Sequence, residues 1–216
     1  MIPLNSHIFD TVELDSNSLT PQLAIVAQVG AAGRYRGDVA APDGSSKTFT
    51  LAVVPSPAEP SVNIDISQTW SGIPTYTVVE NGYVVISVLS GAGGQTIRIY
   101  NDKEVLLNNL AFRAGQMLIV RVLRPGKHLI TDKTGGGSCN LVVNYPVPKA
   151  PLDAGKADLQ VNQIDATHTV MDPLNLTLSV AQAVVVHLQD KTHIVTTLLA
   201  QTDRIGDRLE TRPVCK

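Results

Sequence analysis

Apolar and polar residues alternate along much of the chain. This pattern predicts β-strands, because successive side chains of a strand point to opposite faces. The alternation is clearest in Val62-Asn63-Ile64-Asp65-Ile66-Ser67. Similar spacing flanks the turn sequence Pro42-Asp43-Gly44-Ser45, with apolar positions at Leu23, Ile25, Ala27 and Val29 before it and at Phe49, Leu51 and Val53 after it. Each of these segments is expected to bury one face.

Short strands are also expected at regular intervals between residues 75 and 145. They are Thr75 to Val79, Tyr83 to Leu89, Thr96 to Tyr100, Val105 to Leu107, Leu118 to Leu123, His128 to Asp132 and Leu141 to Tyr145. The segments between them are rich in residues that tolerate tight turns. This rhythm predicts a mainly β chain, built as a β-sandwich or jelly roll.

The period changes in the C-terminal segment, where the pattern predicts one long α-helix. Ser179-Val180-Ala181-Gln182 has the spacing of a capping box, and Asp172-Pro173 is an alternative helix start. A helix over residues 180–211 would be about 48 Å long. Its heptad positions predict a coiled coil, with an oligomer interface at Val184, Leu188, Lys191, Val195, Leu198, Thr202, Ile205 and Leu209.

A second interpretation of this segment stays open. Ile194, Leu199 and Ala200 lie beside the heptad positions and widen the apolar face. A wider face is typical of an amphipathic helix that packs on its own β domain. Lys191 and Thr202 weaken a coiled coil, although polar heptad positions also select register and oligomer number.

Two Pro-rich connectors, at residues 55–60 and 146–151, divide the chain. Their prolines cannot donate to a strand ladder, so these segments are expected to link modules. The expected division is an extended N-terminal arm over residues 1–20, a β region over 21–71, a jelly-roll-like sandwich over 72–147, an extended linker over 148–171 and a helical oligomerisation segment over 172–216.

Charge and composition exclude some classes of partner. Lys and Arg number 17 against 19 Asp and Glu, and they form no cluster, so no nucleic-acid partner is expected. The N-terminus lacks the pattern of a signal peptide, and no apolar run is long enough to span a membrane, so synthesis in the cytoplasm without a membrane partner is expected. Cys139 and Cys215 favour reduced thiols, with one long-range disulfide as the alternative.

No motif in the chain carries recognisable catalytic chemistry. Nucleophile elbows, phosphate loops and metal-binding spacings are absent. His187 and His193 are too far apart on the expected helix to bind one metal ion. The sequence therefore predicts no enzyme, no cofactor and no metal site, although a pair of glycosidase carboxylates brought together by the fold would leave no motif in the sequence.

Aromatic residues offer one candidate binding surface. Trp70, Tyr76 and Tyr83 lie near one another in sequence and would suit a sugar-binding platform. Core packing is the competing interpretation, and it is favoured because aromatic residues make up only 4% of the chain. Arg36-Gly37-Asp38 spells an integrin-type tripeptide, but its flanking residues have the pattern of a strand.

The order of strands and turns over residues 72–147 carries a family resemblance. Tyr76-Thr77-Val78-Val79 and Asn81-Gly82-Tyr83-Val84-Val85-Ile86 precede a Gly-rich turn, and Asn101-Asp102-Lys103, Arg124-Pro125-Gly126-Lys127 and Leu141-Val142-Val143-Asn144-Tyr145 follow. This order resembles the jelly-roll modules of tailed-bacteriophage fibres and capsid decoration proteins. The resemblance implies a homotrimer on a virion surface that contacts capsid or tail subunits.

These observations lead to two functional hypotheses. The first is a structural virion protein, a head fibre, decoration protein or tail-associated fibre, that works by oligomeric assembly. The second is a receptor- or glycan-binding module that uses the three aromatic residues above.

Overall fold

The computed structural model describes residues 11–91, 93–145, 162–166, 169–180, 182–205 and 208–214. Every regular element in these ranges is a strand; they contain no helix, and so none that is long and apolar enough to cross a membrane. The strands are β1 (Glu13–Asp15), β2 (Leu23–Gln28), β3 (Gly33–Ala40), β4 (Ser46–Val54), β5 (Ser61–Asp65), β6 (Thr75–Val79), β7 (Tyr83–Ser87), β8 (Thr96–Tyr100), β9 (Val105–Asn108), β10 (Met117–Arg121), β11 (Gly126–Asp132), β12 (Ser138–Asn144), β13 (Asn162–Ala166), β14 (Met171–Asp172), β15 (Asn175–Ser179), β16 (Ala183–His187), β17 (Ile194–Ile205) and β18 (Arg208–Pro213).

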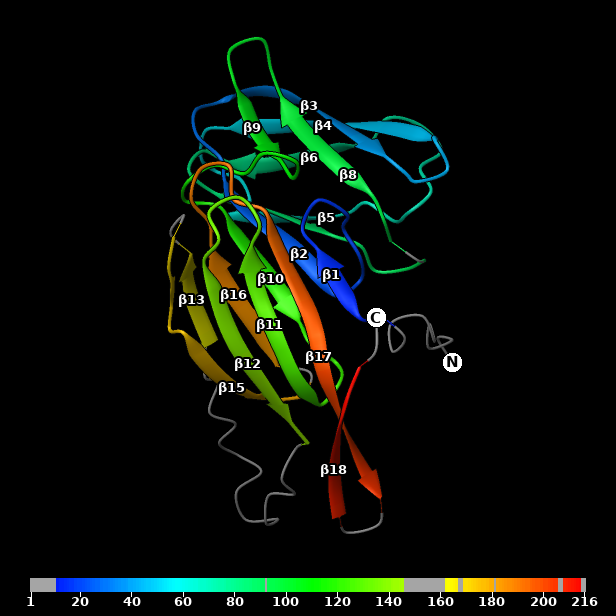
Figure 1. The fold of residues 1–216 in the computed structure, drawn as a ribbon. Coiled ribbons are helices and arrows are strands. Elements are labelled where there is room, and N and C mark those ends of the chain that lie inside the picture. The colour runs from blue at the N-terminus through cyan, green and yellow to red at the C-terminus, as the bar shows by residue number, and fades with distance from the viewer. Residues whose placement is uncertain are drawn as a thin grey trace, which may run out of the picture.

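The strands form three sheets. A seven-stranded sheet of order β14-β13-β16-β10-β2-β7-β5 takes strands from both halves of the chain, and we call it the shared sheet. The first outer sheet has the order β6-β4-β3-β8-β9. The second outer sheet has the order β1-β17-β11-β12-β15, with β18 paired to β17. The first outer sheet lies at the top of Figure 1, and the second outer sheet lies below it.

The chain winds as a β-solenoid of about five turns. Each turn leaves the shared sheet, passes through an outer sheet and returns, as in the step from β5 through β6 to β7. Two successive turns are joined by parallel pairing in each half of the chain. In the first half, β4 pairs with β6 and β5 pairs with β7. In the second half, β12 pairs with β15 and β13 pairs with β16. The remaining strand pairs are antiparallel, and the apolar residues of all turns form one core.

This architecture corrects the expected fold class. The chain is a β-solenoid with three sheets, and not a β-sandwich or jelly roll. Residues 11–20 do not form a free arm, because they contain β1 and bury Leu14 and Leu19. The prediction of a C-terminal α-helix that forms a coiled coil is also wrong, because the described residues of this segment form strands. The expected linker 148–171 lies mostly outside the described residues, as do residues 1–10 of the expected arm.

Residues 180–211, the expected helix, contribute β16, β17 and most of β18, because their sequence satisfies strand geometry better than heptad geometry. Val184, Val186 and Leu188 alternate along one face and are buried. A tight turn then interrupts the chain at Lys191, which has a φ of 60°. Runs of β-branched residues, Val184 to Val186 and Ile194 to Thr197, favour strands over a helix.

The bond expected for the capping box does form, although it closes a turn between strands. The Ser179 N–H donates to Gln182 Oε1 at 2.7 Å, and the Gln182 N–H donates to the Ser179 carbonyl at 3.1 Å. A Ser-x-x-Gln sequence therefore specifies the local bond without specifying a helix.

The strand predictions upstream of this segment are confirmed. The strands expected at Thr75–Val79 and Thr96–Tyr100 have the same bounds in β6 and β8, and the other expected strands correspond to β7, β9, β10, β11 and β12 with shifts at their ends. Phe49, Leu51 and Val53 all face the core. Period-two alternation located these elements because each has one buried face.

The strand registers reveal an internal repeat. In the shared sheet, Ile86 of β7 pairs with Ile25 and Ile64, and Val186 of β16 pairs in the same way with Leu118 and Ile164. The β3–β4 and β11–β12 hairpins follow the same repeat, because Gly33 pairs with Val53 in the first and Gly126 pairs with Val143 in the second. We call β1 to β8 the first repeat and β9 to β17 the second repeat; residues 12–33 align on residues 105–126 without a gap.

The two repeats exchange their first strands. β1 begins the first repeat but pairs with β17 at the end of the second repeat. β9 begins the second repeat but pairs with β8 at the end of the first. Each repeat therefore completes the outer sheet of the other.

One element breaks this correspondence. β8 ends at Tyr100, whereas β17 continues to Ile205 and pairs there with β18. Within the described residues, β18 pairs with no strand besides β17, and the first repeat has no counterpart to β18. The hairpin extends beyond the end of the second outer sheet (Figure 1).

Candidate interaction sites

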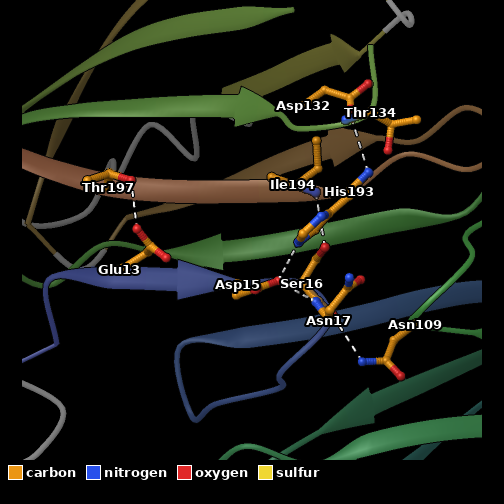
Figure 2. A network of polar contacts seen from close by, with 10 residues as sticks. All are labelled: Glu13, Asp15, Ser16, Asn17, Asn109, Asp132, Thr134, His193, Ile194 and Thr197. Carbon is orange, nitrogen blue, oxygen red and sulfur yellow. Dashed lines mark hydrogen bonds and ion pairs between the residues drawn. The ribbon is translucent and has the colours of Figure 1, made fainter. Parts of the chain in front are cut away.

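A network of polar contacts fixes the exchanged strand β1 (Figure 2). His193 Nε2 lies 2.8 Å from Asp15 Oδ1, and the Asn17 N–H donates to the same oxygen at 2.8 Å. Ser16 lies next to them and is fully buried, with its Oγ accepting the Ile194 N–H at 3.0 Å. The network therefore joins residues from the two ends of the described chain.

Asn109 joins the two strand exchanges. Its Oδ1 accepts the Ile97 N–H at 2.8 Å, which matches the bond from the Ile194 N–H to Ser16 Oγ in the other repeat. Its Nδ2 donates to the Ser16 carbonyl at 3.0 Å (Figure 2). Because Ser16 and Asn109 occupy equivalent places, this bond links the repeats at the point where their strands cross over.

Asp132 is a fully buried acid at the edge of the network. Its Oδ1 accepts the N–H groups of Thr134 at 2.9 Å and His193 at 3.1 Å. Its Oδ2 has no hydrogen-bond partner among the described residues. The carboxyl group thereby ties the β11–β12 turn to the segment before β17.

The network has a structural arrangement rather than a catalytic one. The Ser16 hydroxyl is buried and already accepts a backbone N–H, so no base activates it as a nucleophile. In the ranges that the structure describes, no three His, Cys, Asp or Glu side chains gather as metal ligands. Apart from the His193–Asp15 contact, which joins two side chains, the contacts of Asp15, Ser16 and Asn109 hold backbone N–H and carbonyl groups in place.

The β17–β18 hairpin carries two large apolar side chains that are exposed to solvent. Ile205 is 52% and Leu209 is 61% exposed. At its base, the Thr202 N–H donates to the Pro125 carbonyl, and the Tyr145 hydroxyl donates to the Thr202 carbonyl. Beyond these bonds two strands extend alone, and an isolated two-stranded hairpin is marginally stable in water.

One face of the hairpin places two carboxylates, Asp203 and Glu210, beside one arginine, Arg212. Asp203 and Glu210 face each other across the strands, and like charges in this arrangement repel. Arg212 Nη2 lies 2.8 Å from Glu210 Oε2, and these two carboxylates raise the pKa of the Arg212 guanidinium. Both members of this ion pair are largely exposed.

The heptad residues assigned to an oligomer interface are split by the structure. Val184, Leu188, Val195 and Leu198 are buried within this chain. Lys191 is in the turn before β17, and Thr202 lies half-buried at the base of the hairpin. Only Ile205 and Leu209 of this set present a large apolar surface to solvent.

A groove of about 400 Å³ crosses the outer face of the first outer sheet. Arg34, Arg36, Thr50, Tyr100 and Ile73 are among its lining residues. Arg36 and Tyr100 are both held by Asp38, through an ion pair at 2.7 Å and a hydrogen bond at 2.8 Å. Arg34 is exposed and has no such partner within the described residues, so it can meet an anionic ligand.

The three aromatic residues proposed as a platform do not form one. Trp70 and Tyr76 each make an edge-to-face contact with the buried Phe49, at centroid distances of 5.8 and 5.7 Å. The Lys47 ammonium covers the Trp70 ring at 4.6 Å. Tyr83 is exposed on β7 of another sheet.

No protein-family model, curated protein or solved structure matches this chain. The fold and its surfaces therefore supply the evidence for function.

Cys139 and His128 both have structural environments. Burial raises the pKa of the Cys139 thiol to about 11, which keeps it protonated and unreactive at neutral pH. Cys215, its alternative disulfide partner, lies outside the described residues. His128 is buried, and its Nε2 lies 2.9 Å from the Arg124 carbonyl, to which the Nε2–H donates.

His128 predicts a loss of stability in acid. Burial lowers its pKa from the ordinary value, so the folded protein binds this proton less readily than the unfolded chain does. Its contribution is complete above the unfolded pKa of about 6.5 and is lost as pH falls below that value, by at most about 1.4 kcal/mol per pH unit. Urea unfolding at pH 7.5 and pH 5 should show a smaller pH effect in His128→Gln than in wild type. An equal effect in both proteins would contradict this assignment.

Proposed function

We propose that this chain is a structural protein that works by self-assembly, as a component of a tailed-phage virion. The observation that carries the proposal is the β17–β18 hairpin, an extension beyond the internal repeat with exposed apolar residues and a free strand edge. Exposed strand edges pair with further strands unless they are blocked.

The virion location has a separate basis. It rests on the resemblance of the strand and turn order over residues 72–147 to phage fibre and decoration proteins, without the jelly roll that the resemblance implied. Capsid or tail subunits are the further partners on this proposal. No cofactor or catalytic role is part of it.

Light scattering after size exclusion tests self-assembly directly. The chain has a mass of 23.0 kDa, and the proposal expects a larger particle whose mass depends on protein concentration. Deletion of residues 203–211 should return the mass to that of one chain. A mass of one chain for the intact protein at every concentration would contradict the proposal.

A receptor- or glycan-binding module is the second candidate function. It is favoured by the groove on the first outer sheet, where Arg34 is available to a carboxylate and Tyr100 offers an aromatic ring. A glycan array separates the two candidates, because the assembly proposal expects no glycan to bind.

A further inference from the structure

The outward edge of β18 carries backbone groups that are available for pairing. The Val214 N–H donates to the Leu199 carbonyl at 3.0 Å, and Pro213 pairs with Ala200. Hydrogen-bonded positions alternate along an antiparallel strand. Leu209, Thr211 and Pro213 therefore direct their backbone groups away from β17, and this edge has no partner strand among the described residues.

We propose that β18 pairs antiparallel with β18 of a second copy of this chain, in a contact centred on Thr211. This inference rests on the proposed function. The two hairpins then form one four-stranded sheet of order β17-β18-β18-β17. Three or more strands are stable where an isolated hairpin is not. The contact is isologous, so it closes as a dimer.

The charge order of β18 selects this register. With Thr211 opposite Thr211 of the second copy, Glu210 faces the second copy's Arg212, and the reciprocal pair forms as well. A shift that centres the contact on Glu210 places Glu210 opposite itself and Arg208 opposite Arg212. A shift in the other direction opposes the two Arg212 side chains. Both shifts bring like charges together and are unfavourable.

A centre at Leu209 also pairs opposite charges, here Arg208 with Glu210. However, β18 begins at Arg208, so that register overlaps only the start of the two strands. The register centred on Thr211 pairs residues 209–213 and so covers all of the strand except Arg208. It also brings a second arginine to the carboxylates of Asp203 and Glu210, which repel each other within one chain.

The contact places Glu210 and the second copy's Arg212 at positions that do not share backbone hydrogen bonds across the interface. Side chains approach most closely at such positions. Pro213 has no N–H and loses one bond to the second copy's Leu209, which keeps the contact weak. The dimer is small, so its expected dissociation constant is about 1 to 100 μM.

Charge exchange between two single variants tests the contact. Glu210→Arg alone opposes Arg with Arg, and Arg212→Glu alone opposes Glu with Glu, so each should dimerise about tenfold more weakly than wild type. An equimolar mixture of the two variants should restore the dimer, because each interface then pairs Arg with Glu twice. Light scattering at about 10 to 500 μM protein gives the masses.

Arg208→Glu is the matched control. Arg208 faces Val214 of the second copy in the proposed register, so this variant should dimerise like wild type, whereas the register centred on Leu209 expects it to dissociate. Single variants that dimerise like wild type, or a mixture that stays monomeric, would overturn the β18 contact. Self-assembly that persists in such variants leaves the proposed function standing, whereas a monomeric wild-type protein removes both proposals.

Discussion

Replacing Asn109 with leucine is expected to lower the free energy of unfolding by about 2–4 kcal/mol. The side chain is fully buried and makes both of its bonds to backbone, accepting from the Ile97 N–H and donating to the Ser16 carbonyl. Leucine has the same number and branching of side-chain heavy atoms and can form neither bond. Two buried polar groups would then lack partners, and each such group costs about 1–3 kcal/mol.

Asn140→Leu is the control for this substitution. Asn140 is exposed on β12, and its Nδ2 donates to Asn175 Oδ1 at 3.2 Å. Replacement there should change the free energy of unfolding by no more than about 0.5 kcal/mol. Chemical denaturation monitored by tryptophan fluorescence measures both variants. Equal stabilities would show that Asn109 does not join the two repeats energetically.

Gly126→Ala is expected to destabilise the protein by about 4 kcal/mol, while Gly33→Ala stays within about 1 kcal/mol of wild type. These glycines occupy equivalent places in the two repeats, opposite Val143 and Val53. Gly126 has a φ of 144°, a conformation that side chains rarely adopt, and a Cβ there would overlap the Ala200 carbonyl. A backbone atom cannot move aside as a flexible side chain can.

Gly33 has room for the same substitution. A Cβ at this position would lie 3.8 Å from Tyr35 Cε2, an ordinary contact. The difference arises because β11 and β17 shift register between Lys127 and His128, which brings Ala200 close to Gly126. Thermal unfolding of the pair provides the measurement. Similar melting temperatures for the two variants would contradict the described packing.

Local patterns in the sequence were sufficient for most single strands and insufficient for their assembly. Period-two alternation located β5 to β12 because each of these strands buries one face. It failed after residue 179, where Val184, Leu188, Val195 and Leu198 satisfy a heptad and a strand at once. The Gln189-Asp190-Lys191-Thr192 turn was the available signal against a helix, and it was missed.

The internal repeat also left a readable signal. Residues 75–88 and 175–188 share Thr77 with Thr177, Val84 with Val184 and Val85 with Val185, at constant spacing. Recognition of this repeat would have assigned the second segment to strands, because the first segment was already expected to form them. The exchange of β1 and β9 had no such signal, since pairing between distant edges depends on the assembled sheets.

The polar network was likewise inaccessible to motif reasoning. Asp15, Ser16, Asn109 and His193 lie in short polar segments of the sequence, and none belongs to a recognised spacing. Their relation appears only when the strand exchange brings residues near position 15 against residues near position 193.

The exchange of β1 and β9 gives the molecule the construction of a tethered dimer. Each repeat is incomplete without a strand from the other, as in two subunits that trade their first strands. In separate subunits, the folded fraction would depend on protein concentration. Here both copies lie in one chain, so partner finding becomes an intramolecular step, and the fold remains complete at any dilution.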